Sequence, residues 1–344
     1  MNFSVIPYLL KFKTPFRLAH GTRSSTQTVY IRLEHENITG YGEATLPPYQ
    51  SETINSVQSW VIKHQNLITT KHLLNPTKEI FPVDLKNPTA SAALEMSVYN
   101  WYLKRHKLSP VNFLVHEHEA NYQTTFTISK TDTNRINQIK ETCANYSMLK
   151  LKLTGEDDDL EFVKSIISKI KKPFCVDINQ GYSDKNTVLK LTIALKQLEC
   201  VLIEQPLKKR DYEGHLWLKN QVSIPIIADE SIQNLKELKL FKEYFDGINI
   251  KIMKCGGLHQ AQKMLDFIDH RTDQDFIKLL GCMSESTLGV GMATTLINRF
   301  EYVDLDGPEL ISNDPFEGFR ISKSLVKANL IKPKHPSILP QYKF

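Results

Sequence analysis

Short apolar segments recur along residues 122–308 at a spacing that few folds produce. Each step from one segment to the next spans roughly 22 to 30 residues, the length of a strand plus a helix in a (β/α)8 barrel. Amphipathic stretches such as "DLEFVKSIISKIKK" lie between the segments. The segments are TTFTIS, MLKLKL, FCVDIN, VLIEQP, PIIADES, GINIKI, FIKLLGC and YVDLDGP. The sequence therefore predicts an α/β fold with a (β/α)8-type barrel.

The residues before the barrel have a different pattern. Two β-like stretches come first, and helical patterns follow near residues 51–70 and 88–107. We expect an N-terminal α+β capping domain over residues 1–118 and a barrel catalytic domain over residues 119–312. The tail, residues 313–344, has no strong pattern and is expected to pack back on the first domain.

Charge and cysteine spacing exclude several classes of protein. The chain carries 43 Lys and Arg against 38 Asp and Glu, a net charge of +5, and its basic residues form no stripe, so no nucleic-acid partner is expected. The five cysteines lack zinc-ligand or CxxC spacing. The start has no signal-peptide pattern, and no segment approaches the roughly 18 apolar residues of a membrane span. We expect a cytoplasmic protein without a membrane partner, and the oligomeric state, including a homo-oligomer, stays open.

Polar residues stand at the ends of the predicted barrel strands, where barrels carry their chemistry. Several come in pairs two residues apart, which places both members on one face of a strand. A single polar residue at a strand end is usually a cap. Pairs on four strands predict a shared polar pocket, and these pairs are Lys150/Lys152, Asp177/Asn179, Asn249/Lys251 and Asp304/Asp306.

Three carboxylates, Asp177, Glu204 and Asp229, end three consecutive strands. Converging carboxylates repel unless a cation lies between them. Hard oxygen ligands at this density suit Mg²⁺ with open positions for a substrate oxygen. The alternative is that these acids form buried salt bridges with Lys152 and Lys251.

Two lysines, Lys152 on the second strand and Lys251 on the sixth, are expected to face each other across the barrel mouth. A lysine with an ordinary pKa near 10.4 is a poor base at neutral pH. Neighbouring cations, here Lys150 and the metal, together with desolvation are expected to lower the lysine pKa. Two bases on opposite sides of one carbon can invert a stereocentre.

The motifs around these residues carry a family resemblance over nearly the whole chain. In order and spacing they resemble the enolase superfamily, in its muconate-lactonising subgroup, and most closely the dipeptide epimerases of the L-Ala-D/L-Glu epimerase type. The matching motifs are GYGEATLPPY at 40–49, KLK at 150–152, DINQGY at 177–182, EQP at 204–206, ADES at 228–231, NIKIMKCGG at 249–257, GCMSES at 281–286 and DLD at 304–306.

The resemblance implies a role for each candidate residue. It implies Mg²⁺ ligands at Asp177, Glu204 and Asp229, and an acid/base pair at Lys152 and Lys251. By the same likeness Asp304 and Asp306 hold a substrate ammonium, Lys150 helps to bind the substrate carboxylate, and Thr127 and Cys282 line the pocket. The capping loops "PFRLAHGTRSST" and "EATLPPYQSET" are expected to close over the substrate.

One departure concerns side-chain selectivity. Glutamate-selective members of the family carry an arginine in the first capping loop. The matching position here is Gly21, with Arg23 displaced by two residues. Arg23 is therefore a candidate specificity residue, and the preferred substrate side chain stays open.

The expected function is a Mg²⁺-dependent dipeptide epimerase that inverts the α-carbon of the C-terminal residue through an ene-diolate. The alternatives within the superfamily are an o-succinylbenzoate synthase, a muconate cycloisomerase or an N-acylamino-acid racemase. Asp304 and Asp306 favour the dipeptide, because nothing nearby in the sequence neutralises them and a substrate ammonium would. A non-catalytic barrel scaffold is disfavoured, because no expected ligand or base is lost.

Overall fold

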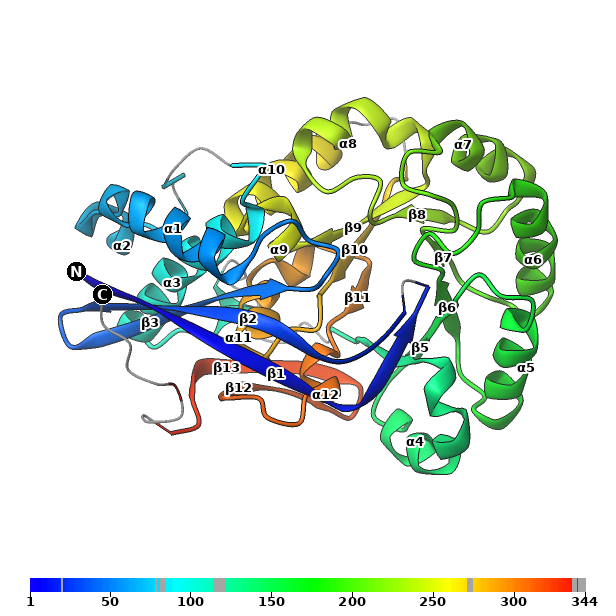
Figure 1. The fold of residues 1–344 in the computed structure, drawn as a ribbon, viewed down its shortest axis with the longest axis horizontal. Coiled ribbons are helices and arrows are strands. Elements are labelled where there is room, and N and C mark those ends of the chain that lie inside the picture. Colours follow the sequence, from blue (N-terminus) through cyan, green and yellow to red (C-terminus); the bar gives the residue numbers. More distant parts are fainter. Residues whose placement is uncertain are drawn as a thin grey trace.

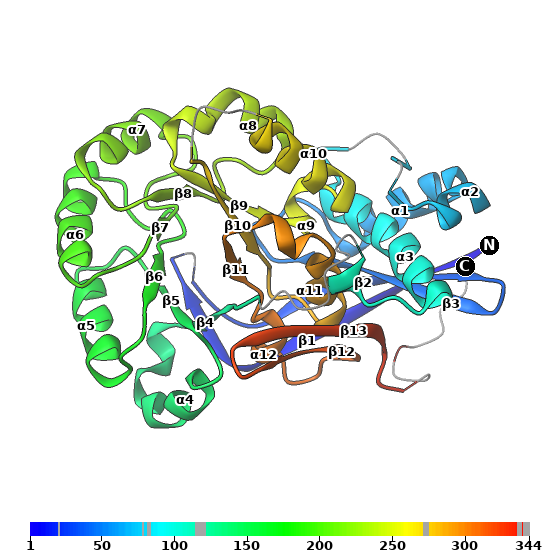
Figure 2. The ribbon, with the colours of Figure 1, turned by 180° about the vertical axis from the view of Figure 1, so that it is seen from behind.

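A computed structural model describes residues 1–19, 21–77, 79–80, 84–113, 122–270, 275–335 and 339. Figures 1 and 2 show a barrel ringed by helices and, beside it, a smaller part built on an antiparallel sheet. Within the described residues, no helix has both the length and the apolar character that crossing a membrane requires.

Eight parallel strands form the barrel sheet in the described part of the chain, in the order β11-β10-β9-β8-β7-β6-β5-β4. The first and last strands meet through side chains, since Thr125 Oγ1 donates to Asp304 Oδ1 (2.6 Å) and Leu305 N donates to Thr124 Oγ1 (2.8 Å). The predicted barrel is confirmed. Its strands are β4 (Thr125–Ile128), β5 (Met148–Lys152), β6 (Phe174–Asp177), β7 (Ile203–Glu204), β8 (Ile226–Ala228), β9 (Gly247–Lys251), β10 (Ile277–Gly281) and β11 (Tyr302–Asp304).

Helices follow the strands and cover the outside of the barrel. Their apolar faces pack on the strands, with Phe162, Val163 and Ile166 of α5 as an example. The elements are η3 (Lys130–Arg135), α4 (Ile136–Cys143), α5 (Asp159–Lys169), α6 (Lys185–Gln197), α7 (Tyr212–Gln221), α8 (Leu235–Phe241), η4 (Lys242–Tyr244), α9 (Ile252–Cys255), α10 (Leu258–Asp269), α11 (Thr287–Ala293), η5 (Thr294–Arg299) and α12 (Gly307–Leu310).

The capping part pairs β1 (Asn2–Leu18), β2 (Gly21–His35) and β3 (Ile38–Leu46) in an antiparallel sheet. The long helix α3 (Pro88–His106) lies so close to β3 that a Cβ on Gly42 would collide with the backbone of Ala93. This close approach needs glycine and buries a core that includes Val29, Val57 and Trp101. The remaining elements are α1 (Ile54–His64), η1 (Gln65–Leu67), α2 (Thr70–Leu74) and η2 (Pro110–Asn112).

Strands β1 and β2 form a ribbon that extends from the capping sheet to the barrel (Figure 1). Its far end touches the barrel at exposed groups. Arg17 pairs with Glu156 (2.5 Å), and Thr131 Oγ1 donates to the Pro15 carbonyl (2.9 Å). The ribbon therefore reaches the face on which the strands end.

The C-terminal part forms a hairpin of β12 (Phe316–Ser322) and β13 (Leu325–Pro333), which the sequence analysis did not predict. Its turn residues Lys323 and Ser324 both have positive φ, 50° and 64°. Such a turn usually carries Asn or Gly, so the sequence lacks the expected signal. The Phe316 ring contacts Tyr30 of the cap, at a centroid distance of 5.1 Å. The predicted domain boundary at 118/119 lies outside the described residues.

Candidate active site

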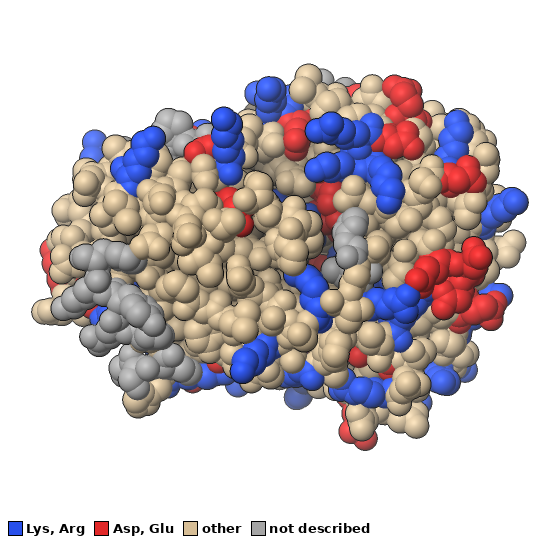
Figure 3. All heavy atoms as spheres, in the orientation of Figure 1, with Lys and Arg blue, Asp and Glu red and all other residues tan. Residues whose placement is uncertain are grey.

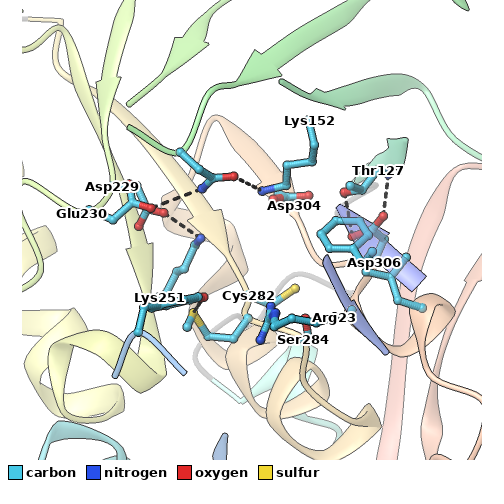
Figure 4. Close-up of a pocket in the computed structure, with 16 residues that line it drawn as sticks. Arg23, Thr127, Lys152, Asp229, Glu230, Lys251, Cys282, Ser284, Asp304 and Asp306 are labelled. Atoms are coloured by element: carbon cyan, nitrogen blue, oxygen red, sulfur yellow. Dashed lines mark hydrogen bonds and ion pairs between the residues drawn. The ribbon is translucent and has the colours of Figure 1, made fainter. Parts of the chain in front are cut away.

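A pocket lies where the barrel strands end, and residues of the capping sheet complete its wall (Figure 4). Figure 3 shows acidic atoms in a hollow on this face, with Lys and Arg side chains around it. Barrel and cap both supply lining side chains. They are Phe16, Arg23, Tyr49, Thr127, Lys152, Asn179, Asp229, Glu230, Lys251, Cys282, Met283, Ser284, Asp304, Asp306, Gly307 and Leu310.

The three predicted metal ligands come together at one edge of the sheet. Asp177 ends β6 and lies opposite Glu204 of β7, while Asp229 follows β8 directly. None is more than 1% exposed. Parallel pairing of adjacent strands produces this convergence, as the sequence predicts.

Lys150 lies one layer deeper in the barrel than Lys152, and its ammonium group binds three carboxylates. Its Nζ is 2.7 Å from Glu204 Oε2, 2.7 Å from Asp304 Oδ2 and 3.1 Å from Asp177 Oδ2. Lys150 is 1% exposed and is not among the residues that line the pocket. Strand parity fixes the face of a residue and leaves its depth open, and the expected contact of Lys150 with a substrate carboxylate stays a prediction.

Lys152 and Lys251 both line the pocket and enter it from different strands, β5 and β9. Figure 4 shows their side chains converging on the same space. Lys152 Nζ donates to Asp177 Oδ2 (2.5 Å), and Lys251 Nζ donates to Asp229 Oδ2 (2.9 Å). The two amines therefore reach the pocket from opposite parts of the sheet.

Ion pairing controls the protonation of these groups. Burial raises the pKa of Asp177, but Lys152 and Lys150 outweigh it and hold that pKa below its usual range. Burial lowers the pKa of Lys251, but Asp229 and Glu204 outweigh it and leave the pKa well above its ordinary value. Among the protein's own groups, Asp229 and Glu204 outweigh the cation Lys150, and the lowered lysine pKa expected beside a bound metal stays a prediction.

The donor set fits a hard divalent cation. Burial and then the charge of Asp177 raise the pKa of Glu204 to about 7, and Asp229 adds to the shift, so three acids crowd one place. Among the described residues, no three His, Cys, Asp or Glu side chains are already arranged as a metal site. The ammonium groups of Lys150 and Lys251 instead lie beside the Glu204 oxygens. Clustered carboxylates are what Mg²⁺ binds in proteins.

Asp304 and Asp306 both line the pocket but have different partners. Asp304 pairs with Lys150, so the inference that nothing neutralises the two aspartates is wrong for Asp304. Asp306 instead accepts hydrogen bonds from Thr127 N (2.6 Å) and Thr127 Oγ1 (3.2 Å). Burial and the nearby Asp304 raise the pKa of Asp306 to about 7. Asp306 is thus the member of the pair that would gain most from a cation.

Arg23 reaches the pocket from β2, beside the rings of Phe12 and Tyr49, each 5.7 Å from its guanidinium carbon. Its Nε and Nη1 atoms are buried and have no hydrogen-bond partner among the described residues. Burial lowers its pKa. The structure therefore places a cation with free N–H donors in the wall that the cap supplies.

Several lining residues were not among the predicted site residues. Phe16 and Tyr49 lie within the two capping-loop segments that were expected to close over the substrate. The sequence therefore indicated the segments but not these individual residues. Glu230 directly follows Asp229 and accepts a hydrogen bond from Asn179 (3.2 Å). Cys282, predicted to line the pocket, is half-buried there.

The described residues form a capped barrel with carboxylates and lysines at its strand ends, and known proteins share this arrangement. A family model described as "Enolase C-terminal domain-like" matches residues 134–321. The L-Ala-D/L-Glu epimerase of Bacteroides thetaiotaomicron is 33% identical, over 96% of this chain and 86% of the relative. The L-Ala-D/L-amino acid epimerase of Flavobacterium johnsoniae is 28% identical, over 95% and 96%.

A solved structure shares the fold over almost the whole chain. The dipeptide epimerase of Enterococcus faecalis V583, complexed with Mg and the dipeptide L-Leu-L-Tyr, has a TM-score of 0.83 and 26% identity. The match covers 96% of this chain and 99% of that one. The chain therefore belongs to the enolase superfamily. Its relatives are named epimerases, and the chain is an isomerase.

Proposed function

We propose that the protein is a Mg²⁺-dependent dipeptide epimerase that inverts the α-carbon of the C-terminal residue. The observation that carries the proposal is the convergence of Lys152 and Lys251 on one pocket from different strands, beside three buried carboxylates. One lysine in its neutral form takes the α-proton, breaking the C–H bond. The other, as an ammonium, returns a proton to the opposite face of the same carbon.

The carboxylates hold these amines in place. Asp177 orients Lys152, and Asp229 accepts from both Lys251 (2.9 Å) and Lys254 (2.6 Å). Mg²⁺ held by Asp177, Glu204 and Asp229 would supply positive charge for the ene-diolate oxygens. Phe16 and Tyr49 line the pocket from the cap and would limit the access of water to the carbanion-like carbon.

The amino end of the dipeptide is assigned to Asp304 and Asp306. Asp306 faces the pocket with a raised pKa and forms no ion pair with a lysine in the part of the chain that the structure describes, so a substrate ammonium would favour its charged form. Asp304 adds charge on the same side. This arrangement supports a substrate with a free α-amine.

For the inverted residue we propose an acidic side chain. Arg23 lines the pocket with two buried nitrogen atoms that lack hydrogen-bond partners among the described residues. A carboxylate is the group that best satisfies such donors. The naming of the Bacteroides relative as an L-Ala-D/L-Glu epimerase agrees with this choice.

A second candidate is an N-acylamino-acid racemase. The observation in its favour is that Lys150 already neutralises Asp304, which reduces the need for a substrate ammonium. It would use the same lysines and carboxylates. The two candidates differ only in what occupies the space beside Asp306.

The deciding experiment is deuterium uptake at the C-terminal α-carbon in deuterated water, followed by NMR over a panel of L,L-dipeptides and their N-acetyl forms. We expect uptake with free dipeptides, strongest with glutamate or aspartate at the second position. Equal turnover of acetylated and free substrates would replace the dipeptide reading with the racemase. No uptake with any member would end both.

A further inference from the structure

One buried carboxylate connects the cap to the barrel directly behind the pocket. Glu43 stands on β3, is 0% exposed, and reaches the first turn of α11. It accepts hydrogen bonds from Ser286 N (2.9 Å), Ser286 Oγ (2.5 Å) and Gly289 N (3.0 Å). The catalytic scheme above gives this residue no role.

The segment that Glu43 holds is continuous with the pocket wall. Cys282, Met283 and Ser284 line the pocket, and Ser286 follows two residues later. Glu285 fixes the same loop from inside, since its Oε1 accepts from Met283 N (2.7 Å). A Cβ on Gly289 would collide with Glu285 Oε2 and crowd Glu43 Oε2, so the two carboxyl groups meet where glycine leaves room.

A second cap carboxylate provides a built-in comparison. Glu95 of α3 is also buried and accepts a hydrogen bond from His259 N (3.1 Å) at the start of α10. Yet α10 contributes no residue to the pocket lining. Both acids therefore dock the cap on the barrel, but only Glu43 does so through a pocket loop.

We propose that Glu43 is a positioning residue that holds the loop of residues 282–286 in the shape the substrate pocket requires. Docking of the cap is then coupled to substrate affinity through one side chain. The kinetic consequence rests on the proposed function. The structural consequence does not.

The surroundings of the two acids support the assignment. Burial raises the pKa of Glu43 to about 7, although the hydrogen bonds from Ser286 and Gly289 act to lower it. Burial and the charge of Glu43 raise the pKa of Glu285 to about 8. Each carboxylate oxygen of Glu43 accepts a hydrogen bond from one backbone N–H group, that of Ser286 or of Gly289, so a glutamine, with a single acceptor oxygen, would leave one of them buried and unsatisfied, which loops relieve by moving.

The test uses Cys282 as a reporter on the loop. Its thiol pKa lies well above the ordinary value because of burial, so alkylation by iodoacetamide starts slow. We expect Glu43→Gln, and less strongly Ser286→Ala, to speed Cys282 alkylation by about tenfold, the factor that one lost buried hydrogen bond allows. Peptide mass spectrometry reads the rate, and the buried Cys143, Cys175, Cys200 and Cys255 report any general loosening.

The matched controls are Glu95→Gln, at the other cap–barrel contact, and Glu52→Gln, whose carboxylate accepts from Thr89 N and Ala90 N within the cap. Both should leave the Cys282 rate unchanged. With the dipeptide substrate, Glu43→Gln should raise KM by about tenfold and change kcat little, whereas the controls change neither.

An unchanged Cys282 rate in Glu43→Gln, or an equal gain in Glu95→Gln, would overturn the proposal. If Glu43→Gln does not fold, Ser286→Ala decides alone by the same criterion. If wild-type protein epimerises no dipeptide while Glu43→Gln still exposes Cys282, the proposed function fails and the positioning role stands.

Discussion

Two regions of this molecule bury carboxylates, and they differ in the groups that offset the cost of burial. At the barrel mouth, Asp177 and Asp229 stand beside lysines that hold their pKa values below the usual range despite burial. At the seam between cap and barrel, Glu43 and Glu95 receive backbone N–H groups, and burial raises their pKa values to about 7 and about 8. The chemical groups are alike, and the partners decide their charge.

The carboxylates at the barrel mouth belong to the proposed active site, whereas those at the seam join the cap to the barrel. Ionic groups that balance one another stay charged in a low-dielectric interior and can act on a substrate. Burial raises the pKa values of Glu43 and Glu95, which form no ion pair among the described residues, and burial together with Asp177 also raises that of Glu204 at the barrel mouth.

The ionic region is the group of paired lysines and carboxylates at the barrel mouth, and its proposed chemistry depends first on Lys152 and Lys251. Lys152→Ala and Lys251→Ala should each lower epimerisation by about a thousandfold or more, within the range of a lost general acid or base. Each variant should still exchange the α-proton of one substrate epimer, which NMR in deuterated water can detect. Lys190→Ala, on the exposed face of α6, is the control. Normal epimerisation by either pocket variant would break the two-base scheme.

The same region should require a divalent cation. Chelation, or Glu204→Gln, should abolish turnover while circular dichroism shows an intact fold, because a charged oxygen donor is lost without a change in shape. Restored turnover on adding Mg²⁺ to chelated wild-type protein is the control. Full activity in metal-free protein would show that the lysines alone balance the carboxylates.

Among the described residues Asp306 forms no ion pair with a lysine, and we expect a substrate ammonium to supply the missing positive charge. Acetylating the dipeptide amine should lower kcat/KM by roughly 100-fold, since two charge-assisted hydrogen bonds are lost. Asp306→Asn should penalise the free dipeptide more than the acetylated one. Equal effects on both substrates would contradict the assignment.

Arg23 is a half-buried cation that forms no ion pair with a carboxylate among the described residues, the reverse of the seam acids. Arg23→Met should lower kcat/KM for an acidic dipeptide by about tenfold or more and spare an apolar one. Competition between L-Ala-L-Glu and L-Ala-L-Leu measures the ratio directly. A loss that is equal for both substrates would indicate a structural role for Arg23.

The seam should make stability depend on pH. Folded Glu95 titrates at about 8, whereas an unfolded glutamate titrates near 4.3, so the folded state holds an extra proton between these values. The free energy of unfolding should therefore fall as pH rises through this window, by at most about 1.4 kcal/mol per pH unit for the group. Glu95→Gln should flatten that slope in urea unfolding at pH 5.5 and 7.5. Glu141→Gln, on the exposed side of α4, should not.

The sequence predicted the ionic region well because its signal is local. Lys152, Asp177 and Lys251 stand at strand ends, and the alternation of a strand fixes their face. The sequence did not predict how deep Lys150 lies in the barrel, because two residues on the same face of a strand lie at different distances from the barrel mouth. The sequence did not predict the contacts at the seam. Glu43 and Ser286 are 243 residues apart, and a glutamate in a β-strand carries no mark of its partner. The β12–β13 hairpin escaped because Lys323 and Ser324 do not resemble turn residues.

The ribbon of β1 and β2 has a consequence for redesign. It brings Phe16 and Arg23 to the pocket, yet its far end touches the barrel at exposed groups such as Arg17 and Glu156. Side-chain changes near its tip can therefore be sampled in a small library while every strand-end residue is kept. In the proposed scheme the cap's contribution to selectivity, Arg23, lies on a different stretch of the gene from the strand-end lysines and carboxylates, so exchanging first segments among relatives would test that contribution directly.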